Sequence, residues 1–441
     1  MSKELAMNSK AQKEYDLRLT SAEEAIRLIK NGDRIYTGTS SSVAYGIDET
    51  LAAHKDDFED LTIMCAFLTK ESPLINCGKF NILTYFMGPQ ERTGLSSGIT
   101  DYTSIHLSQL NLWIKEIARP DVAVLEVSPP DEEGYMSYGA TGVVMHDYMK
   151  ECASKVILQV NKNAPYVYGY KNKIHCTEAD AIVEADTELG EIHDAEISEN
   201  IRKMCSFVTE QIPDGATLQL GTGKVANALG YMLSEKNDLG LHTEVMGDST
   251  MNLIKNGNIN NRVKTFQPGK SVVGFAYGTK ELYRFLDHNE SMYFMPLPVI
   301  NDPYTIAKND NMISINNALS IDLTGQVASE STGFKQHSGT GGQLDYVRGA
   351  QMSKGGKSFI LLESTFHSKR TGAHGSHIVS TLSPGTAVST PRSDVQYVVT
   401  EYGCVNLKLL TIKERVHALI SIAHPDYRQQ LAEEARAAGL I

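Results

Sequence analysis

The chain has 441 residues, of which 41% are hydrophobic and 21% are charged. These fractions are ordinary for a globular protein and argue against long disordered regions. Acidic residues outnumber basic ones by 53 to 41, so the formal net charge is −12 at pH 7. A chain this acidic is a poor non-specific partner for nucleic acids or anionic membranes. We therefore expect small-molecule ligands and no nucleic-acid partner.

The cysteine pattern and the N-terminal residues indicate the compartment. Six cysteines are spread along the chain without CxxC spacing, a density far too low for a disulfide scaffold. Residues 1–16 are polar with mixed charge and lack the apolar core of a signal peptide. No stretch approaches the roughly 18 uninterrupted apolar residues of a membrane span. These features predict a cytoplasmic protein without a membrane segment.

Short runs rich in Val and Ile alternate with amphipathic segments along the chain. The first clear helix is expected at Ala22–Lys30, because Ser21 precedes it and Glu24 follows three residues later, the spacing of a capping box. In chain order, strands are predicted at Arg34–Thr37, Leu61–Cys65, Val122–Val127, Lys155–Val160, Thr217–Leu220, Glu244–Met246, Ser358–Leu362 and Gln396–Thr400. Strands that alternate with helices predict parallel sheets in an α/β architecture.

A weak internal repeat indicates two related halves. Asn31–Gly38 and Asp214–Gly221 share a turn glycine, a strand and a closing glycine at one common offset, and a helical pattern follows each. Any two strand–glycine–helix units look somewhat alike, so chance similarity is the alternative. We predict an N-terminal domain over residues 1–195 and a C-terminal domain over residues 196–441.

The sharpest local signal is Thr217–Ala226, a strand followed by G-x-G-x-x-A and a helix. Such glycines let backbone N–H groups approach a phosphate at a helix N-terminus. Glu244 follows at the next strand, where a dinucleotide-binding fold uses an acid to hold a ribose. Taken alone, this pattern favours an NAD-dependent dehydrogenase. The alternative is a tight strand-to-helix turn with an incidental glutamate.

Other features argue against the dehydrogenase. The fingerprint lies past the midpoint of the chain, and the corresponding loop of the first copy, Gly38–Ser42, lacks the second glycine. A second glycine-dense run, Ser338–Gln343, is either a surface loop or a set of backbone donors that converge on a ligand oxygen. His374 and His377 have no adjacent carboxylate or cysteine, so we expect no metal site.

Several ordered stretches then point to one family. They are Val127–Asp131, Val160–Asn161, Leu218–Gly223, His242–Glu244, Asp322–Gln326, Gly339–Gln343, Val398–Gly403 and Ala423–Asp426. Together they resemble the acetyl-CoA hydrolase/transferase branch of the family I CoA-transferases, over nearly the whole chain. The resemblance implies two structurally related α/β domains with mostly parallel sheets and an active-site cleft between them.

The resemblance also implies a reaction. Glu244 would attack a short-chain acyl-CoA, giving an acyl-glutamyl anhydride and then a glutamyl-CoA thioester in ping-pong fashion. A carboxylic acid such as acetate would accept the CoA, with substrates of the butyrate or 4-hydroxybutyrate class. Coenzyme A would be a substrate, no prosthetic group is implied, and a homo-oligomer is expected. An acyl-CoA hydrolase with the same nucleophile, the NAD-dependent dehydrogenase and a nucleotide-binding protein without turnover remain alternatives.

The resemblance further implies which residues contact CoA. They are Gly221, Thr222, Gly223, Lys224, Val225, Asn316, Leu319, Gly339, Gly341, Gly342 and His367. The glycines at 339, 341 and 342 would donate backbone N–H groups to the oxyanions of the reaction. Relatives often carry a lysine where His367 stands, so His367, Lys369 or Arg370 is expected to replace it.

The repeat also predicts the number of sites. At the repeat offset, Glu244 falls opposite Ile63–Met64, where the first half has no acid. We therefore expect one active site per chain. The first half would supply the acyl pocket, including the loop near Ser128–Tyr138.

Overall fold

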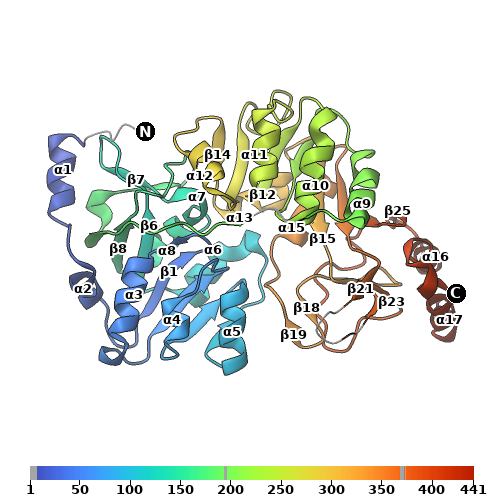
Figure 1. Cartoon of the computed structure of the whole chain (residues 1–441), viewed down its shortest axis with the longest axis horizontal. Helices are drawn as coiled ribbons and strands as arrows, with labels where there is room; N and C mark the ends of the chain where they lie inside the picture. Colours follow the sequence, from blue (N-terminus) through green and yellow to red (C-terminus); the bar gives the residue numbers. More distant parts are fainter. Residues whose placement is uncertain (1–6, 193–195, 368–371, 373) are drawn as a thin grey trace. The chain divides into compact units, whose positions relative to one another are not determined.

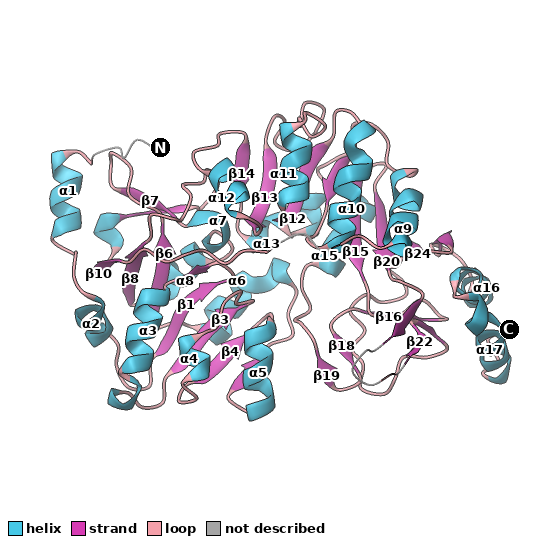
Figure 2. Cartoon of the chain, in the orientation of Figure 1, coloured by secondary structure: helices cyan, strands magenta, loops and turns pink. Residues whose placement is uncertain are grey.

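The computed structural model of the chain describes residues 7–192, 196–367, 372 and 374–441. These residues form two compact units, each built on a largely parallel β-sheet with helices (Figures 1 and 2). The first unit contains the residues up to 192 together with 245–247 and 272–300. The second unit contains the remaining residues from 196 onward. The predicted α/β class with mostly parallel sheets is confirmed.

The sheet of the first unit has the strand order β10-β8-β6-β1-β3-β4-β5, and neighbours in this order run parallel. Its strands are β1 (Arg34–Thr39), β3 (Thr62–Ala66), β4 (Asn81–Thr84), β5 (Thr100–Tyr102), β6 (Val122–Val127), β8 (Lys155–Val160) and β10 (Ala181–Glu184). Ile35, Val124 and Ile157 on the central strands are fully buried. Strands covered on both faces are expected to be nearly continuous hydrophobic runs, which is why β6 and β8 were readable from the sequence.

The first unit also contains short helices and smaller strands. They are β2 (Ser42–Val43), β7 (Tyr135–Ser137), β9 (Lys173–His175), β13 (Ser271–Ala276), β14 (Met292–Phe294), α1 (Ser9–Asp16), α3 (Tyr45–Ala53), α4 (Pro73–Asn76), α5 (Pro89–Ser97), α6 (Leu110–Trp113), α7 (Gly139–Gly142), α8 (His146–Cys152), α12 (Lys280–Leu286) and α13 (Leu297–Ile300). β2 folds back on β1 as its antiparallel neighbour.

The helix predicted at Ala22–Lys30 is shorter than expected. α2 covers Ala22–Ala25 and continues as a 3₁₀ turn. The Oγ atom of Ser21 accepts the backbone N–H of Glu24 at 3.2 Å, so the predicted N-cap residue is correct. The 3₁₀ turn ends at Leu28, and the Lys30 N–H then donates to the Asp33 carboxylate at 2.8 Å in the turn that leads into β1.

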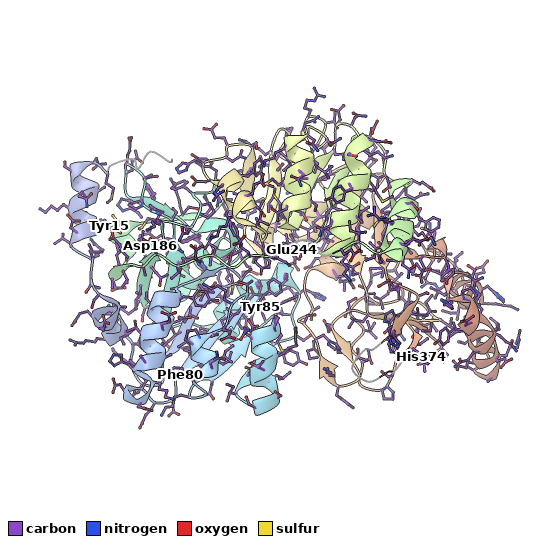
Figure 3. The ribbon with its side chains drawn as sticks, viewed as in Figure 1. Tyr15, Phe80, Tyr85, Asp186, Glu244 and His374 are labelled. Carbon is purple, nitrogen blue, oxygen red and sulfur yellow. The ribbon has the colours of Figure 1, made fainter. Side chains whose placement is uncertain are left out.

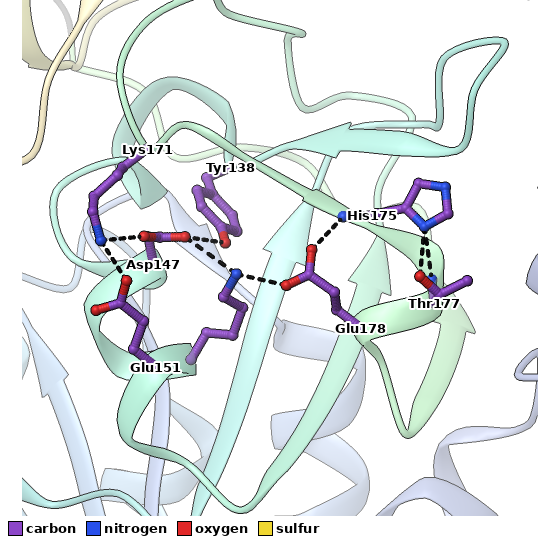
Figure 4. Close-up of polar contacts among 8 residues, drawn as sticks. Tyr138, Asp147, Glu151, Lys171, His175, Thr177 and Glu178 are labelled. Carbon is purple, nitrogen blue, oxygen red and sulfur yellow. Dashed lines mark hydrogen bonds and ion pairs between the residues drawn. The ribbon is translucent and has the colours of Figure 1, made fainter.

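A polar network ties α8 to its surroundings within the first unit (Figure 4). Asp147 is almost fully buried at its centre. The Tyr138 hydroxyl donates to Asp147 at 3.2 Å, and Lys171 pairs with the other carboxylate oxygen at 2.8 Å. Lys150 bridges Asp147 and Glu178 at 3.3 and 2.8 Å. The two ammonium groups compensate the buried carboxylate, so we interpret this network as structural.

The sheet of the second unit includes the order β12-β11-β15-β20-β24-β25. These strands are β11 (Thr217–Gln219), β12 (Gly240–Met246), β15 (Met312–Asn317), β20 (Lys357–Leu361), β24 (Tyr397–Thr400) and β25 (Gly403–Asn406). The first five run parallel, and β25 is antiparallel to β24. The order β12-β11-β15-β20-β24 repeats the order β3-β1-β6-β8-β10 of the first unit. The predicted internal repeat is therefore confirmed.

The helices of the second unit are longer on average. They are α9 (Glu199–Thr209), α10 (Lys224–Met232), α11 (Asp248–Lys255), α14 (Pro303–Ile306), α15 (Gln343–Met352), α16 (Ile412–Ile422) and α17 (Pro425–Ala437), with small strands β16 (Ser320–Asp322), β17 (Val327–Ala328), β18 (Ser331–Thr332), β19 (Lys335–Gln336), β21 (Thr365–His367), β22 (His374–Ser376) and β23 (Ile378–Val379). α9, α10 and α11 pack side by side (Figure 1). Among the described residues, no helix has the length and apolarity needed to span a bilayer.

Candidate active site

The strand order of the second unit reverses at the carboxyl ends of β11 and β15. From β11 the chain continues to β12 on one side, whereas β15 lies on the other side. Open α/β sheets bind ligands outside the carboxyl ends of their strands at such a reversal. A pocket lies here and is lined by Leu220, Gly221, Thr222, Val225, Ala226, Leu229, Ile315, Asn316 and Asn317. The structure thus brings together Gly221, Thr222, Val225 and Asn316, four of the residues predicted to contact CoA.

The loop Gly221–Gly223 leads from β11 into α10. Gly223 has a φ of +89°, in the left-handed region that favours glycine. A β-carbon at Gly221 would meet no atom within 4 Å, so the space beside this residue is open. Lys224 is the exposed first residue of α10. The free N–H groups of the first helical turn therefore begin at the pocket loop, where they favour an anionic ligand.

Asn316 is held in place from the neighbouring strand. Gln219 on β11 is buried, and its Oε1 atom accepts the Ile315 N–H at 3.1 Å and the Asn316 Nδ2 group at 3.2 Å. One acceptor therefore fixes both the backbone of β15 and the side-chain amide beside it. This interaction determines how Asn316 is presented to the pocket.

Glu244 lies on the strand next to this pocket. Leu218 on β11 pairs with Leu241 on β12, and continuing this register for three residues brings Gly221 level with Glu244. The Thr243 hydroxyl donates at 2.7 Å to the carbonyl just before Gly221, which holds the two chains together. Figure 3 labels Glu244, which belongs to the second unit.

The Glu244 carboxylate is partly buried and is contacted by a side chain and a glycine. The fully buried Asn301 donates its Nδ2 group to Oε2 of Glu244 at 2.7 Å. At Gly342, a β-carbon would lie 1.9 Å from the same oxygen and 2.2 Å from Asn301 Nδ2. Gly342 has an ordinary φ of −96°. Glycine is therefore required here because the backbone approaches the carboxylate closely.

The turn that contains Gly342 is anchored outside the site. Gly341 adopts a left-handed φ of +70°, and Gly342 is the N-cap residue of α15. The next residue, Gln343, accepts hydrogen bonds from the hydroxyls of Ser329 and Thr390 at 2.9 and 3.0 Å. Its amide donates to the Asn317 carbonyl at 2.9 Å. These three contacts fix the glycine turn against Glu244.

The acidity of Glu244 follows from this environment. Burial is the largest effect and raises the pKa of Glu244 to about 7. The hydrogen bond from Asn301 favours the carboxylate and opposes the rise in pKa, whereas the negative charge of Asp345 adds to it. A carboxylate with this pKa is more basic than an ordinary glutamate and remains substantially ionised at neutral pH. It is therefore suited to act as a nucleophile.

Comparison with known proteins places this chain in a family. Residues 2–192 match the acetyl-CoA hydrolase/transferase N-terminal domain, and residues 278–435 match the C-terminal domain. The chain belongs to the acetyl-CoA hydrolase/transferase family. It is therefore an enzyme of this family, as the ordered sequence stretches predicted.

Individual members of the acetyl-CoA hydrolase/transferase family resemble this chain over its full length. The chain is 40% identical to the 4-hydroxybutyrate coenzyme A transferase of Clostridium kluyveri, over 95% of this chain and 97% of that protein. It is 37% identical to the butyryl-CoA:acetate CoA-transferase of Anaerostipes caccae, over 97% and 98%. The crystal structure of RipA from Yersinia pestis superposes with a TM-score of 0.91 at 34% identity and covers 98% of this chain and 100% of that chain.

Other residues that the family resemblance suggested lie away from the pocket lining. Leu319 is half-buried just before β16 and donates its N–H to the Ala328 carbonyl at 2.8 Å. His367 is exposed at the end of β21, opposite His374. Lys369 and Arg370 lie outside the described residues. The described residues contain no group of three or more His, Cys, Asp or Glu side chains that could hold a metal ion.

Two residues of this candidate site were not assigned from the sequence. Asn301 precedes Asp302 and Pro303, and this Asp–Pro pair caps α14. The local pattern is therefore explained without any reference to Glu244. Asp345 is an acid in the first turn of a helix, a common position because it complements the helix dipole. Its burial, at 4% exposure, is what distinguishes it, and burial is not visible in one sequence.

Proposed function

We propose that this protein transfers CoA from a short-chain acyl-CoA to a carboxylic acid such as acetate, with Glu244 as the covalent carrier. The observation that carries the proposal is the Glu244 carboxylate held between Asn301 and Gly342, one strand away from a pocket at the switch point. The names of the relatives support substrates of the butyrate or 4-hydroxybutyrate class.

The first step is the attack of the carboxylate on the thioester. Asn301 donates a hydrogen bond to Oε2 of Glu244, so we assign Oε1 as the attacking oxygen. Oε1 bonds to the acyl carbonyl carbon, the carbon–sulfur bond breaks, and CoA leaves as the thiolate. The product on the enzyme is an acyl-glutamyl anhydride. Negative charge moves from oxygen to sulfur, so this step needs no proton transfer.

The second step returns the thiolate to the enzyme. In the anhydride, Oε1 of Glu244 bridges the two acyl groups and Oε2 is the glutamyl carbonyl oxygen. Attack of the thiolate on Cδ therefore places developing negative charge on Oε2. The Nδ2 group of Asn301 already lies 2.7 Å from that oxygen. A donor placed in advance where charge develops is the main source of stabilisation in acyl transfer.

Collapse of this intermediate completes the half-reaction. The bond from Cδ to Oε1 breaks, a carboxylate product leaves with the electron pair, and a glutamyl-CoA thioester remains. An acceptor carboxylate then reverses the two steps and leaves as the new acyl-CoA. Part of the CoA molecule would occupy the pocket formed by Gly221, Thr222, Val225 and Asn316. In every step a bond from an acyl carbon to oxygen or sulfur forms while another such bond breaks. The groups involved are the Glu244 carboxylate, the substrate carboxylates and the CoA thiolate.

The test is intact-protein mass spectrometry after incubation with butyryl-CoA. We expect a mass increase equal to CoA minus water in the unmodified protein and its loss in Glu244→Gln. Glu126→Gln is the matched control, because Glu126 in the first unit is a buried glutamate with a pKa raised to about 8. The adduct should persist in that variant.

Three other outcomes would redirect the proposal. An adduct that persists in Glu244→Gln would show that another residue is the nucleophile. An adduct that forms while acetate fails to take up CoA, and free CoA accumulates, would indicate an acyl-CoA hydrolase. NADH formation from a hydroxy acid, without any adduct, would indicate the dehydrogenase alternative.

A further inference from the structure

The first turn of α15 contacts one carboxyl group and carries another. Gly342 begins the helix directly against the Glu244 carboxylate, and Asp345 lies three residues later in the same turn. Asp345 is only 4% exposed. A buried acid is costly unless its environment compensates the charge. The N-terminal turn of a helix supplies favourable potential for a negative charge, so this position suits an ionised Asp345.

The carboxyl group of Glu244 lacks the helical position that favours a negative charge on Asp345. Glu244 is on β12, outside the helix, and its ionised form faces the same turn that already carries Asp345. Two like charges in a poorly solvated site disfavour each other, and the cost falls on the group with less compensation. The raised pKa of Glu244, for which burial is the first cause and Asp345 a further one, agrees with this arrangement.

We infer that Asp345 is a positioning residue that drives Glu244 toward its covalent state: its fixed charge repels the Glu244 carboxylate but not the neutral glutamyl thioester. This inference rests on the proposed function. In the half-reaction, the Glu244 carboxylate and an acyl-CoA become glutamyl-CoA and a free carboxylate. The carbon–sulfur bond of the substrate breaks, a carbon–sulfur bond to Glu244 forms, and the negative charge leaves with the product. The repulsion between Asp345 and Glu244 is present before this exchange and absent after it.

The test variant is Asp345→Asn, which leaves the other titratable groups around Glu244 unchanged. Tyr346 follows Asp345 on α15 and is fully buried. His242 lies two residues before Glu244 on β12, and its ring centroid is 6.2 Å from that of Tyr346. Asn301, on the third segment that contacts Glu244, is uncharged. Asp345→Asn therefore removes one charge and keeps the shape of the side chain.

The experiment measures an equilibrium in addition to a rate. Intact-protein mass spectrometry gives the fraction of enzyme in the glutamyl-CoA form at fixed ratios of butyryl-CoA to butyrate. We expect the equilibrium constant for forming this species to be lower by about three- to tenfold in Asp345→Asn, since tenfold corresponds to one unit of pKa. The pH at which adduct formation is half-maximal should move to a lower value, because Glu244 ionises more easily without its neighbour.

Control variants separate this effect from a structural one. Asp345→Glu keeps the charge and should keep the equilibrium constant close to that of the unmodified protein, and Asp345→Ser is a second neutral variant if Asp345→Asn does not fold. Asp394→Asn removes an acid that pairs with Arg348 of the same helix at 3.3 Å on the outer side, and it should change neither quantity.

The result that would overturn the inference is specific. If folded Asp345→Asn forms the adduct more slowly but with the same equilibrium constant and the same pH midpoint, Asp345 acts only through the structure of the turn. If the unmodified protein forms no adduct on Glu244, the proposed function fails, and the inference falls with it. The two failures are therefore distinguished by the unmodified protein.

Discussion

Each unit contains a glutamate with a raised pKa on its repeated sheet, and the two differ in how far they are buried. Burial raises the pKa of Glu126 on β6 to about 8 and that of Glu244 on β12 to about 7. In both residues Oε2 accepts an asparagine Nδ2 group, from Asn161 at 2.9 Å and from Asn301 at 2.7 Å. By acidity and by hydrogen bonding, the two sites look alike.

Access separates the two glutamates. Oε2 of Glu126 accepts a second hydrogen bond from the Thr187 hydroxyl at 3.1 Å, and the residue is only 1% exposed. Glu244 is partly exposed, lies beside a pocket and is approached by the backbone of Gly342. A perturbed pKa marks a candidate site but also marks buried structural acids. The comparison shows that a glycine approach and an adjacent pocket are the features that make Glu244 a candidate nucleophile.

The loops that follow β1 and β11 also differ in the space around them. After β1 the chain folds back as β2, and the Ser42 N–H donates to the Thr141 hydroxyl at 2.7 Å. A β-carbon at Gly38 would meet the Ser42 carbonyl at 2.3 Å, so the loop is packed tightly onto its own strand. At the equivalent place in the second unit, Gly221 borders open space and lines the pocket.

The position that corresponds to Glu244 in the first unit is also clear from strand pairing. Ile35 pairs with Ile63, and Leu218 pairs with Leu241. The register of β1 and β3 shifts after Tyr36, so counting three residues from Ile63 gives Ala66, whereas the partner of Gly38 is Cys65. The position that corresponds to Glu244 is therefore Cys65–Ala66. The constant offset had suggested Ile63–Met64, which differs by one to three residues because the connection between the paired strands is longer in the first unit. The first unit thus has a small side chain without a carboxylate where the second has its candidate nucleophile.

The largest expected effect is that of Gly342→Ala. A β-carbon would overlap Oε2 of Glu244 and Nδ2 of Asn301, so it must displace the carboxylate or its donor. We expect turnover to fall by about 10²–10³, the usual cost of losing one preorganised donor. The control is Gly46→Ala in the first unit, where the new atom would meet Ala185 Cβ at 2.9 Å and Gln159 Oε1 at 3.1 Å. Turnover per folded molecule should fall in Gly342→Ala and stay close to that of the unmodified protein in Gly46→Ala. Equal losses of turnover in the two variants would contradict the comparison.

An intermediate effect concerns the dependence of stability on pH. The folded-state pKa of Glu244, about 7, exceeds the ordinary value of 4.5. Between these values the folded protein binds a proton that the unfolded chain does not, so the unmodified protein loses stability as pH rises through this window. The Tm of Glu244→Gln relative to the unmodified protein should therefore increase from pH 4.5 to 7 and then level off.

The same melting experiment sharpens the comparison between the units. For Glu126→Gln, the increase in relative Tm should continue to about pH 8, because the pKa of Glu126 is higher. Thermal melts at closely spaced pH values measure both curves. Identical windows for the two variants would show that the two environments are equivalent.

The smallest expected effect is that of Gln219→Leu. This change frees the Asn316 side chain at the pocket, so KM for acyl-CoA should rise by a few-fold, as for the loss of about one hydrogen bond, with less change in kcat. Tyr36 stands at the same place in the first unit and bonds to His146 at 3.0 Å. Steady-state kinetics of Tyr36→Phe should show an unchanged KM, and a rise in both variants would indicate general loosening of the fold.

Much of the fold was predictable because it depends on local pattern. β6 and β8, with their continuous apolar runs, were predicted, although β10 and β13 were missed. The turn glycines Gly32 and Gly215, with φ values of 82° and 76°, revealed the repeat. β15 was missed because Ser314, Asn316 and Asn317 interrupt its apolar pattern. Asn316 and Asn317 line the pocket, so the polar side chains at the ligand site obscured the pattern of the strand.

The site was predictable only in part. Gly221 and Asn316 lie far apart in the sequence and were associated by family resemblance, and the structure brings them to one pocket. The contacts of Asn301 and Gly342 with Glu244 join three segments of the second unit that are far apart in the sequence, which no local pattern encodes. The role of Glu244 as nucleophile remains a prediction until the adduct is measured.

The Gln343 side chain links three separate segments around the glycine turn, through Ser329, Thr390 and Asn317. A crosslink of this kind makes local opening of the turn expensive, because all three attachments must release together. Backbone amides of the turn should therefore exchange with deuterated solvent at rates typical of the sheet interior, although glycines usually mark the most mobile loops of an enzyme.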